Sequence, residues 1–261
     1  MSNHLVLGAL LASVSACTTL GPMPATTGLS ATPIGRPGMQ IQAGAVPGYY
    51  ASKSVQNKSD GEPISQLSAL ADLDHWLGVP GVIFGVRVFG QSGDAPGEAF
   101  VGYRKKLGAV SISGVGFGST KRSEKQLASY HGTRLGAEGA VEAELAHNSW
   151  LGVHAQAAVT ATYSSLSGTY CVNSTGIAVD CSPDQPQSNT TVTGDDKGVY
   201  PAATGQLAVD LGPHHGVFDN ARLALLGTAG TMPLIVDGAK RETAAYLMLG
   251  ATLSVTLGFE R

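Results

Sequence analysis

Charged side chains are sparse in this sequence, and several fall on the polar faces of segments in which apolar and polar residues alternate. These residues are Arg87, Arg104, Arg134, Glu138, Glu142, Asp210 and Arg222. A guanidinium group binds a carboxylate through two parallel hydrogen bonds where both groups are confined. If the polar faces point into a closed barrel, we expect these residues to form a charge network that plugs the lumen. We predict no catalytic residue, metal ion or cofactor among them.

The N-terminal residues, MSNHLVLGALLASVSACTTL, contain an apolar run at 5–16 that is too short to span a membrane as a helix. The run is typical of a secretion signal. Its end, VSAC at 14–17, resembles the bacterial lipobox, in which small residues precede a cysteine that is acylated and becomes the mature N-terminus. The resemblance implies a signal peptide over 1–16, lipidation of Cys17 and, because Thr18 follows, the outer membrane. An ordinary signal peptide is the alternative.

Two cysteines remain once Cys17 is assigned to a lipid. Cys171 and Cys181 form an even pair that flanks a polar, turn-rich segment, VNSTGIAVD. Disulfides are usual in exported chains, so we predict a bond between them, which contributes about 3 kcal/mol in the chain-entropy model. Two free thiols in a loop are the alternative.

His131 and Thr133 lie two residues apart on one face of an expected strand. A histidine beside a hydroxyl can generate a nucleophile. The pair resembles the arrangement in outer-membrane lipid A deacylases, in which histidine activates a serine, and the resemblance implies a lipid-modifying activity on the outer wall. Because threonine replaces serine and Glu138 has the opposite parity, we instead predict two polar interface residues and no enzyme.

Two further motifs predict no chemistry. GVGFGSTK at 114–121 differs in spacing from a phosphate-binding loop, and no helical pattern follows it, so we interpret its glycines as relieving crowding in a barrel wall. His214 and His215 lie in a tight turn with no third ligand nearby in the sequence, so we predict no metal site there.

Alternation with period two, which is typical of strands with one apolar face, recurs along the chain. The segments are 39–50, 81–90, 98–107, 109–118, 128–145, 150–165, 200–212, 220–231 and 245–261. From Leu247 to Phe259 the last apolar face reaches about 30 Å at a tilt of about 45°, the thickness of a bilayer's hydrocarbon core. A closed barrel with both termini on one side needs an even number of strands, so we predict another at 62–73, where a short helix is also compatible.

The predicted fold class is all-β: an antiparallel transmembrane β-barrel of eight to ten strands over 39–261, preceded by a flexible, lipidated linker at 17–38 that is rich in Pro, Gly and Thr. Ten strands are preferred and eight are the alternative. Short turns are expected near 108, 148 and 214, and longer polar connections at 91–97, 119–126, 171–198 and 232–242. Short turns on the periplasmic side and longer loops outside are typical of outer-membrane barrels.

Composition narrows the class of protein further. Only 13% of the residues are charged, 35 are glycines and the net charge is −3, without a Lys/Arg-rich stripe, so nucleic-acid binding is excluded. Low charge, strands long enough to span and a signal sequence favour a membrane barrel. The alternative fold is a soluble lipid-carrier barrel, in which the apolar faces would point inward.

Over 39–261 the chain resembles small bacterial outer-membrane barrels of the OmpA, OmpX and OmpW kind, through its alternation, its turn asymmetry and a last strand with a late aromatic, Phe259. The resemblance implies contact with outer-membrane lipids and with the barrel-assembly machinery during biogenesis. Envelope proteins that dock on the outer loops are further expected partners. We hypothesise a non-enzymatic structural or partner-docking role, with a narrow channel and a lipid-modifying enzyme as alternatives.

Overall fold

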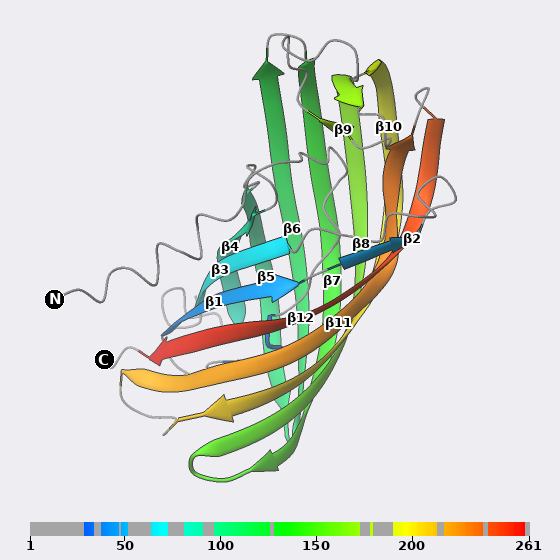
Figure 1. The fold of residues 1–261 in the computed structure, drawn as a ribbon. Coiled ribbons are helices and arrows are strands. Elements are labelled where there is room, and N and C mark those ends of the chain that lie inside the picture. Colours follow the sequence, from blue (N-terminus) through cyan, green and yellow to red (C-terminus); the bar gives the residue numbers. More distant parts are fainter. Residues whose placement is uncertain are drawn as a thin grey trace, which may run out of the picture.

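The computed structural model describes residues 29–33, 38–46, 48–51, 64–72, 81–90, 97–125, 128–172, 178–179, 190–212, 217–236 and 240–258. The fold is all-β and antiparallel, as the sequence predicts, and the strands wrap into one strongly curved sheet (Figure 1). Within these residues no helix has the length and apolar character needed to cross a membrane.

The sheet closes on itself. Its strands are β1 (Gly38–Val46), β2 (Gly48–Ala51), β3 (Ile64–Asp72), β4 (Val82–Gly90), β5 (Gly97–Leu107), β6 (Val110–Lys125), β7 (Ala128–His147), β8 (Leu151–Val172), β9 (Ala178–Val179), β10 (Thr190–Leu211), β11 (Phe218–Val236) and β12 (Lys240–Gly258). The pairing order is β1-β3-β4-β5-β6-β7-β8-β10-β11-β12, and β1 also pairs with β12. β2 pairs with β12 beyond the end of β1, and β9 pairs with β8.

Ten strands therefore make up the ring among the residues described, which is the preferred of the two predicted numbers. The tenth strand is β3. It lies within the segment 62–73, where a further strand was predicted because a closed barrel needs an even number of strands. The segment forms a strand, and the helical alternative is wrong. The pairing of β1 with β12 closes the ring, and in this pairing Gly38 lies opposite Gly258.

Several strands are longer than the sequence predicts. β8 and β10 each have 22 residues, and β6 continues to Lys125 through 119–125, which was expected to be a loop. β10 begins at Thr190 instead of 200, and β11 extends to Val236. Outside a bilayer both faces of a sheet meet water, so alternation ends there while the cross-strand hydrogen bonds continue. The prediction of strand ends from alternation was wrong for this reason.

Side chains alternate between the two faces of the ring. Large apolar residues on the outward face are exposed, including Val101, Val159, Leu207, Leu225, Leu249 and Leu253. Polar residues on the inward face are buried, including Gln42, Thr160, Thr204, Gln206, Thr252 and Ser254. An apolar outside and a polar inside are typical of a membrane-spanning barrel. A soluble lipid carrier needs the reverse arrangement, so that alternative is wrong.

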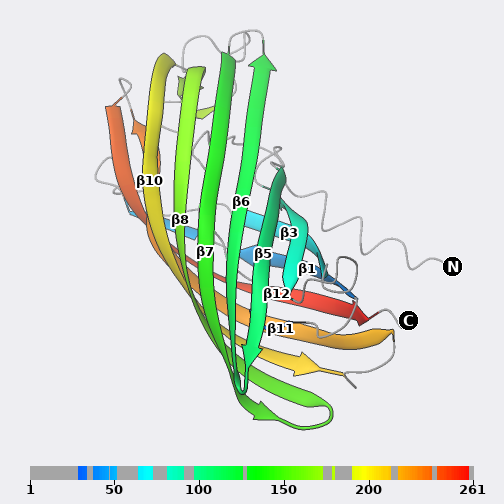
Figure 2. The same ribbon diagram turned by 180° about the vertical axis from the view of Figure 1, so that it is seen from behind.

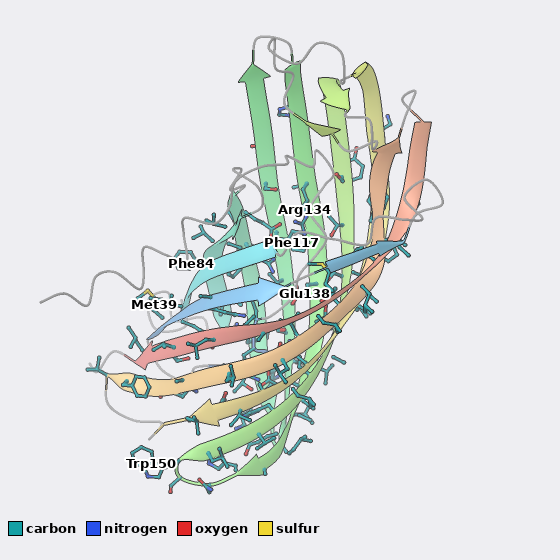
Figure 3. The ribbon with its side chains drawn as sticks, viewed as in Figure 1. Met39, Phe84, Phe117, Arg134, Glu138 and Trp150 are labelled. Carbon is teal, nitrogen blue, oxygen red and sulfur yellow. The ribbon has the colours of Figure 1, made fainter. Side chains whose placement is uncertain are left out.

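One end of the ring carries the short connections, and we call it the short-turn end. Gly108 and Ala109 join β5 to β6, and residues 148–150 join β7 to β8. Gly108 has φ +67°, a conformation that glycine adopts without strain. Trp150 is exposed at this end (Figure 3), where indole rings commonly mark the interface between membrane and water.

The wall of the barrel is uneven in height. β6, β7, β8 and β10 rise well beyond β3, β4 and β5 at the end opposite the short turns (Figures 1 and 2). β5 pairs with β6 only as far as Gly118, so in the described part of the chain residues 119–125 of β6 pair with β7 alone. One side of the barrel thus continues as an extended sheet where the other side has ended.

Candidate functional site

Charged side chains gather in two places inside the ring, and the first surrounds Glu142. Arg222 Nη2 lies 2.8 Å from Glu142 Oε1, and its Nε lies 3.5 Å from Asp210 Oδ1. The His154 ring stands between the same carboxylates, with Nδ1 3.2 Å from Glu142 Oε1 and Nε2 3.2 Å from Asp210 Oδ2. We call these four residues the Glu142 cluster. They come from adjacent strands β7, β8, β10 and β11, and all are buried.

The geometry of the Glu142 cluster suits charge pairing. Each ring nitrogen of His154 lies 3.2 Å from a carboxylate oxygen. Glu142 and Asp210 flank opposite edges of the ring and do not converge on one point. Among the described residues no set of three His, Cys, Asp or Glu side chains is placed to hold a metal ion.

The second group lies around Glu98. Arg87 Nη2 is 2.8 Å from Glu98 Oε1, Arg134 Nη1 is 3.5 Å from Glu98 Oε2, and Arg87 Nη1 is 4.0 Å from Glu138 Oε2. The guanidinium carbons of Arg87 and Arg134 stand 5.3 and 5.2 Å from the centre of the Phe117 ring, within cation–π range. Figure 3 shows Phe117, Arg134 and Glu138 together inside the barrel. We call these five residues the Glu98 cluster.

A short stretch of the predicted linker, residues 29–33, also lies inside the ring; we call it the lumen segment. Glu142 accepts hydrogen bonds from the Ser30 hydroxyl (2.9 Å), the Ala31 amide (2.8 Å) and the Thr32 hydroxyl (2.9 Å). Glu142 is 1% exposed. The same carboxylate therefore holds the lumen segment, Arg222 and His154.

All the residues that the sequence assigned to the lumen network are placed on inward faces, and none is more than 8% exposed. They are Arg87, Arg104, Arg134, Glu138, Glu142, Asp210 and Arg222. Six of them belong to the two clusters, and Arg104 points its Nη1 at the Thr32 carbonyl oxygen, 3.4 Å away.

Four participants were not predicted from the sequence: Phe117, Glu98, His154 and the lumen segment. Glu98 shares its parity with Arg104, and His154 lies on the polar face of its own strand, so parity could have found both. The lumen segment gave no such signal, because the stretch LSATP has no apolar period and lies in a Pro-, Gly- and Thr-rich region.

The pair of His131 and Thr133 lies on the outward face of β7, as expected. Thr133 Oγ1 and His131 Nε2 are 3.3 Å apart, and His131 is exposed. Glu138, the nearest carboxylate on β7, lies inside the ring, on the other side of the sheet. The pair therefore has a hydroxyl and a base but no acid from its own strand to orient the ring.

Some predictions rest on residues outside those described. Cys17, Cys181, His214 and His215 are among them. Cys171 lies in β8, where its backbone is opposite Thr191. Lipidation of Cys17 and the disulfide between Cys171 and Cys181 therefore stay predictions. The glycine-rich stretch 114–121 lies in β6, as interpreted from the sequence.

No protein-family model matches the chain, and no curated protein matches it in sequence. Solved structures similar to it are outer-membrane and channel proteins of low identity. Neisserial surface protein A (NspA) is 10% identical over 83% of this chain and 96% of its own, with a TM-score of 0.33. Ail, the attachment invasion locus protein of Yersinia pestis, is 10% identical over 84% and 98%, with a TM-score of 0.30. The CymD monoaromatic hydrocarbon channel is 9% identical over 87% and 90%, with a TM-score of 0.25. These likenesses are too distant to bear on function, and the barrel assignment rests on the strand pairings.

Proposed function

We propose that the chain is a lipid-anchored outer-membrane β-barrel with a closed lumen and a structural or partner-docking role. The observation that carries the proposal is the opposition of its two faces: exposed Val, Leu and Ile side chains outside and buried ion pairs inside. An apolar outer band has no favourable surroundings in water, whereas a bilayer accepts it.

The closed lumen follows from the two charge clusters together with the lumen segment. Arg87 and Arg134 share Glu98, while Arg222 shares Glu142 with the lumen segment. Fixed, paired charges and the segment that they hold are buried together across the interior, and together they leave no continuous column of water for ions. A barrel closed in this way is suited to hold or dock other molecules at its rim, and the narrow channel is the less favoured alternative.

The docking role is supported by the height of the wall. A transmembrane strand needs about 9–11 residues, and β7, β8 and β10 have 20, 22 and 22. Roughly half of each strand therefore extends beyond the bilayer. This part of the sheet, together with the connections at its end, is the surface that we assign to envelope partners.

Heat modifiability of the Cys17→Ser protein is the test of the barrel itself. We expect the unlipidated protein to stay in the outer membrane after carbonate washing, to need detergent for extraction, and to migrate differently on SDS gels before and after boiling. The reason is that the strand-made outer band, and not the lipid, holds the protein in the bilayer. Release of Cys17→Ser by carbonate with no shift in mobility would overturn the membrane-barrel proposal.

A lipid-modifying enzyme is the second candidate function, and the 3.3 Å contact of Thr133 with His131 is the observation that favours it. We expect His131→Ala and the parent to give the same lipid A mass spectrum when each is expressed in a host that lacks the gene, because no acid on β7 orients the histidine. Loss of an acyl chain from lipid A in the parent but not in His131→Ala would instead identify the pair as catalytic.

A further inference from the structure

The ring has more strands than its side chains need to fill it. An eight-stranded barrel is just wide enough for its own side chains, and width grows with strand number. Here the ring has ten strands, and part of the added room holds the lumen segment. No pairing of the described strands includes residues 29–33, so the segment lies within the barrel without being part of its wall.

The contacts of the lumen segment match those of a bound peptide. The Ala31 amide and the Ser30 and Thr32 hydroxyls donate to Glu142, whereas the Thr32 amide donates to the Ser30 hydroxyl at 3.1 Å. The Ser30 hydroxyl also accepts from Arg222 Nη1 at 2.6 Å. Two of its carbonyl oxygens accept hydrogen bonds from the barrel wall. Gln156 Nε2 donates to the Leu29 carbonyl oxygen at 2.9 Å, and Arg104 Nη1 lies 3.4 Å from the Thr32 carbonyl oxygen. Side chains from separate strands thus bind both the backbone and the hydroxyls of a short stretch that bends at Ala31 and Thr32.

Apolar contacts add a preference for size. Leu29 belongs to a buried cluster with Ile83, Phe100, Val115 and Phe117. Ala31 is 0% exposed and packs in a cluster with Ala140 and Ala158. A leucine therefore fits the first position, and a methyl group is all that fits the third.

We propose that the lumen contains a peptide-binding site and that residues 29–33 occupy it as a releasable plug. The site takes a short, bent peptide in which a leucine is followed by small residues, two of which carry hydroxyls. This inference rests on the proposed function, in which the barrel is closed. It adds that the closure depends on a segment which can leave without breaking a strand pairing, whereas the charge clusters belong to the wall.

Conductance of planar bilayers tests the plug. In Ala31→Trp the indole does not fit between Ala140 and Ala158, so we expect the segment to leave and current steps to appear that the parent lacks. The matched control is Ala25→Trp, which places the same residue in the predicted linker outside the lumen segment; it is expected to stay as closed as the parent. Replacing residues 29–32 by four glycines removes the leucine and both hydroxyls and should open the barrel in the same way.

Adding the plug back as a free peptide tests the site. A synthetic peptide of residues 28–33, Gly-Leu-Ser-Ala-Thr-Pro, should bind the four-glycine variant and suppress its current steps. A peptide with Ala for Ser and Val for Thr should bind about tenfold or more weakly, because both hydroxyls lose their hydrogen bonds to Glu142 and the serine hydroxyl also loses its bond from Arg222. Fluorescence anisotropy of labelled peptides measures both affinities.

The outcomes separate the two proposals. A parent that conducts would overturn the closed lumen of the proposed function. A closed parent whose Ala31→Trp and four-glycine variants both stay closed, and bind no peptide, would overturn the plug alone. Equal affinity for the two peptides would overturn recognition of the hydroxyls by Glu142.

Discussion

Replacing Glu142 by alanine is expected to destabilise the barrel by about 3–5 kcal/mol, the usual cost of removing one partner from a buried ion pair. The cause is the position of the carboxylate, which lies between Arg222 and His154 and is 1% exposed. Without it, the Arg222 guanidinium keeps one carboxylate, Asp210, and the neutral Ser30 hydroxyl, so a buried positive charge is left undercompensated. Unfolding by urea, followed through the mobility shift of the refolded protein in detergent, measures the change.

Glu144→Ala is the matched control for Glu142→Ala. Glu144 lies two residues further along β7, and it pairs with Lys106 at 3.2 Å where the lysine side chain is half exposed. Exposed ion pairs contribute about 0–1 kcal/mol, so the barrel should hardly change. Equal losses in the two variants would mean that the Glu142 cluster contributes nothing beyond a surface pair.

Introducing a charge on the outer band is the second large effect that we expect. Val159 is at the middle of the apolar face of β8 and is 66% exposed. In a bilayer, Val159→Arg should cost about 2–4 kcal/mol, as for arginine near the midplane of other barrels. The fraction of protein that inserts into lipid vesicles, read from the mobility shift, should fall accordingly.

Val217→Arg provides the comparison, because Val217 is 65% exposed but lies at the short-turn end, just before β11. Near the interface an arginine costs about 0–1 kcal/mol. The two substitutions therefore differ only if a bilayer surrounds the band. A Val159→Arg protein that inserts as well as Val217→Arg would show that water, and not lipid, covers this face.

The fold could be predicted from the sequence because a period of two fixes which residues share a face. In β8 and β10 alternation alone places Val159 and Leu207 outside and Gln156 and Gln206 inside. It could not give the strand ends. Beyond the bilayer both faces meet water, and residues such as those at 119–125 lose the pattern while their backbone stays paired.

The site could be predicted only in part. Parity put Arg87 and Asp210 inside, but partners are decided by register, which depends on the length of every turn. Arg87 lies directly opposite Glu98, and Asp210 opposite Arg222, so both pairs are cross-strand neighbours. The lumen segment could not be predicted, because it belongs to no strand and its position depends on the shape of the finished interior.

The uneven height of the wall bears on whether neighbouring barrels in one membrane can pair through their strand edges. Over residues 119–125 β6 is an open edge in the described part of the chain, and an open edge is a template for a strand of another molecule. The sequence there is STKRSEK, which is rich in Lys and Arg and has no long apolar side chain. Three basic residues against one acidic residue, Glu124, give the segment a net positive charge, and like charges on two such segments disfavour their pairing. The barrels can therefore crowd together without joining into fibres through their outer rims.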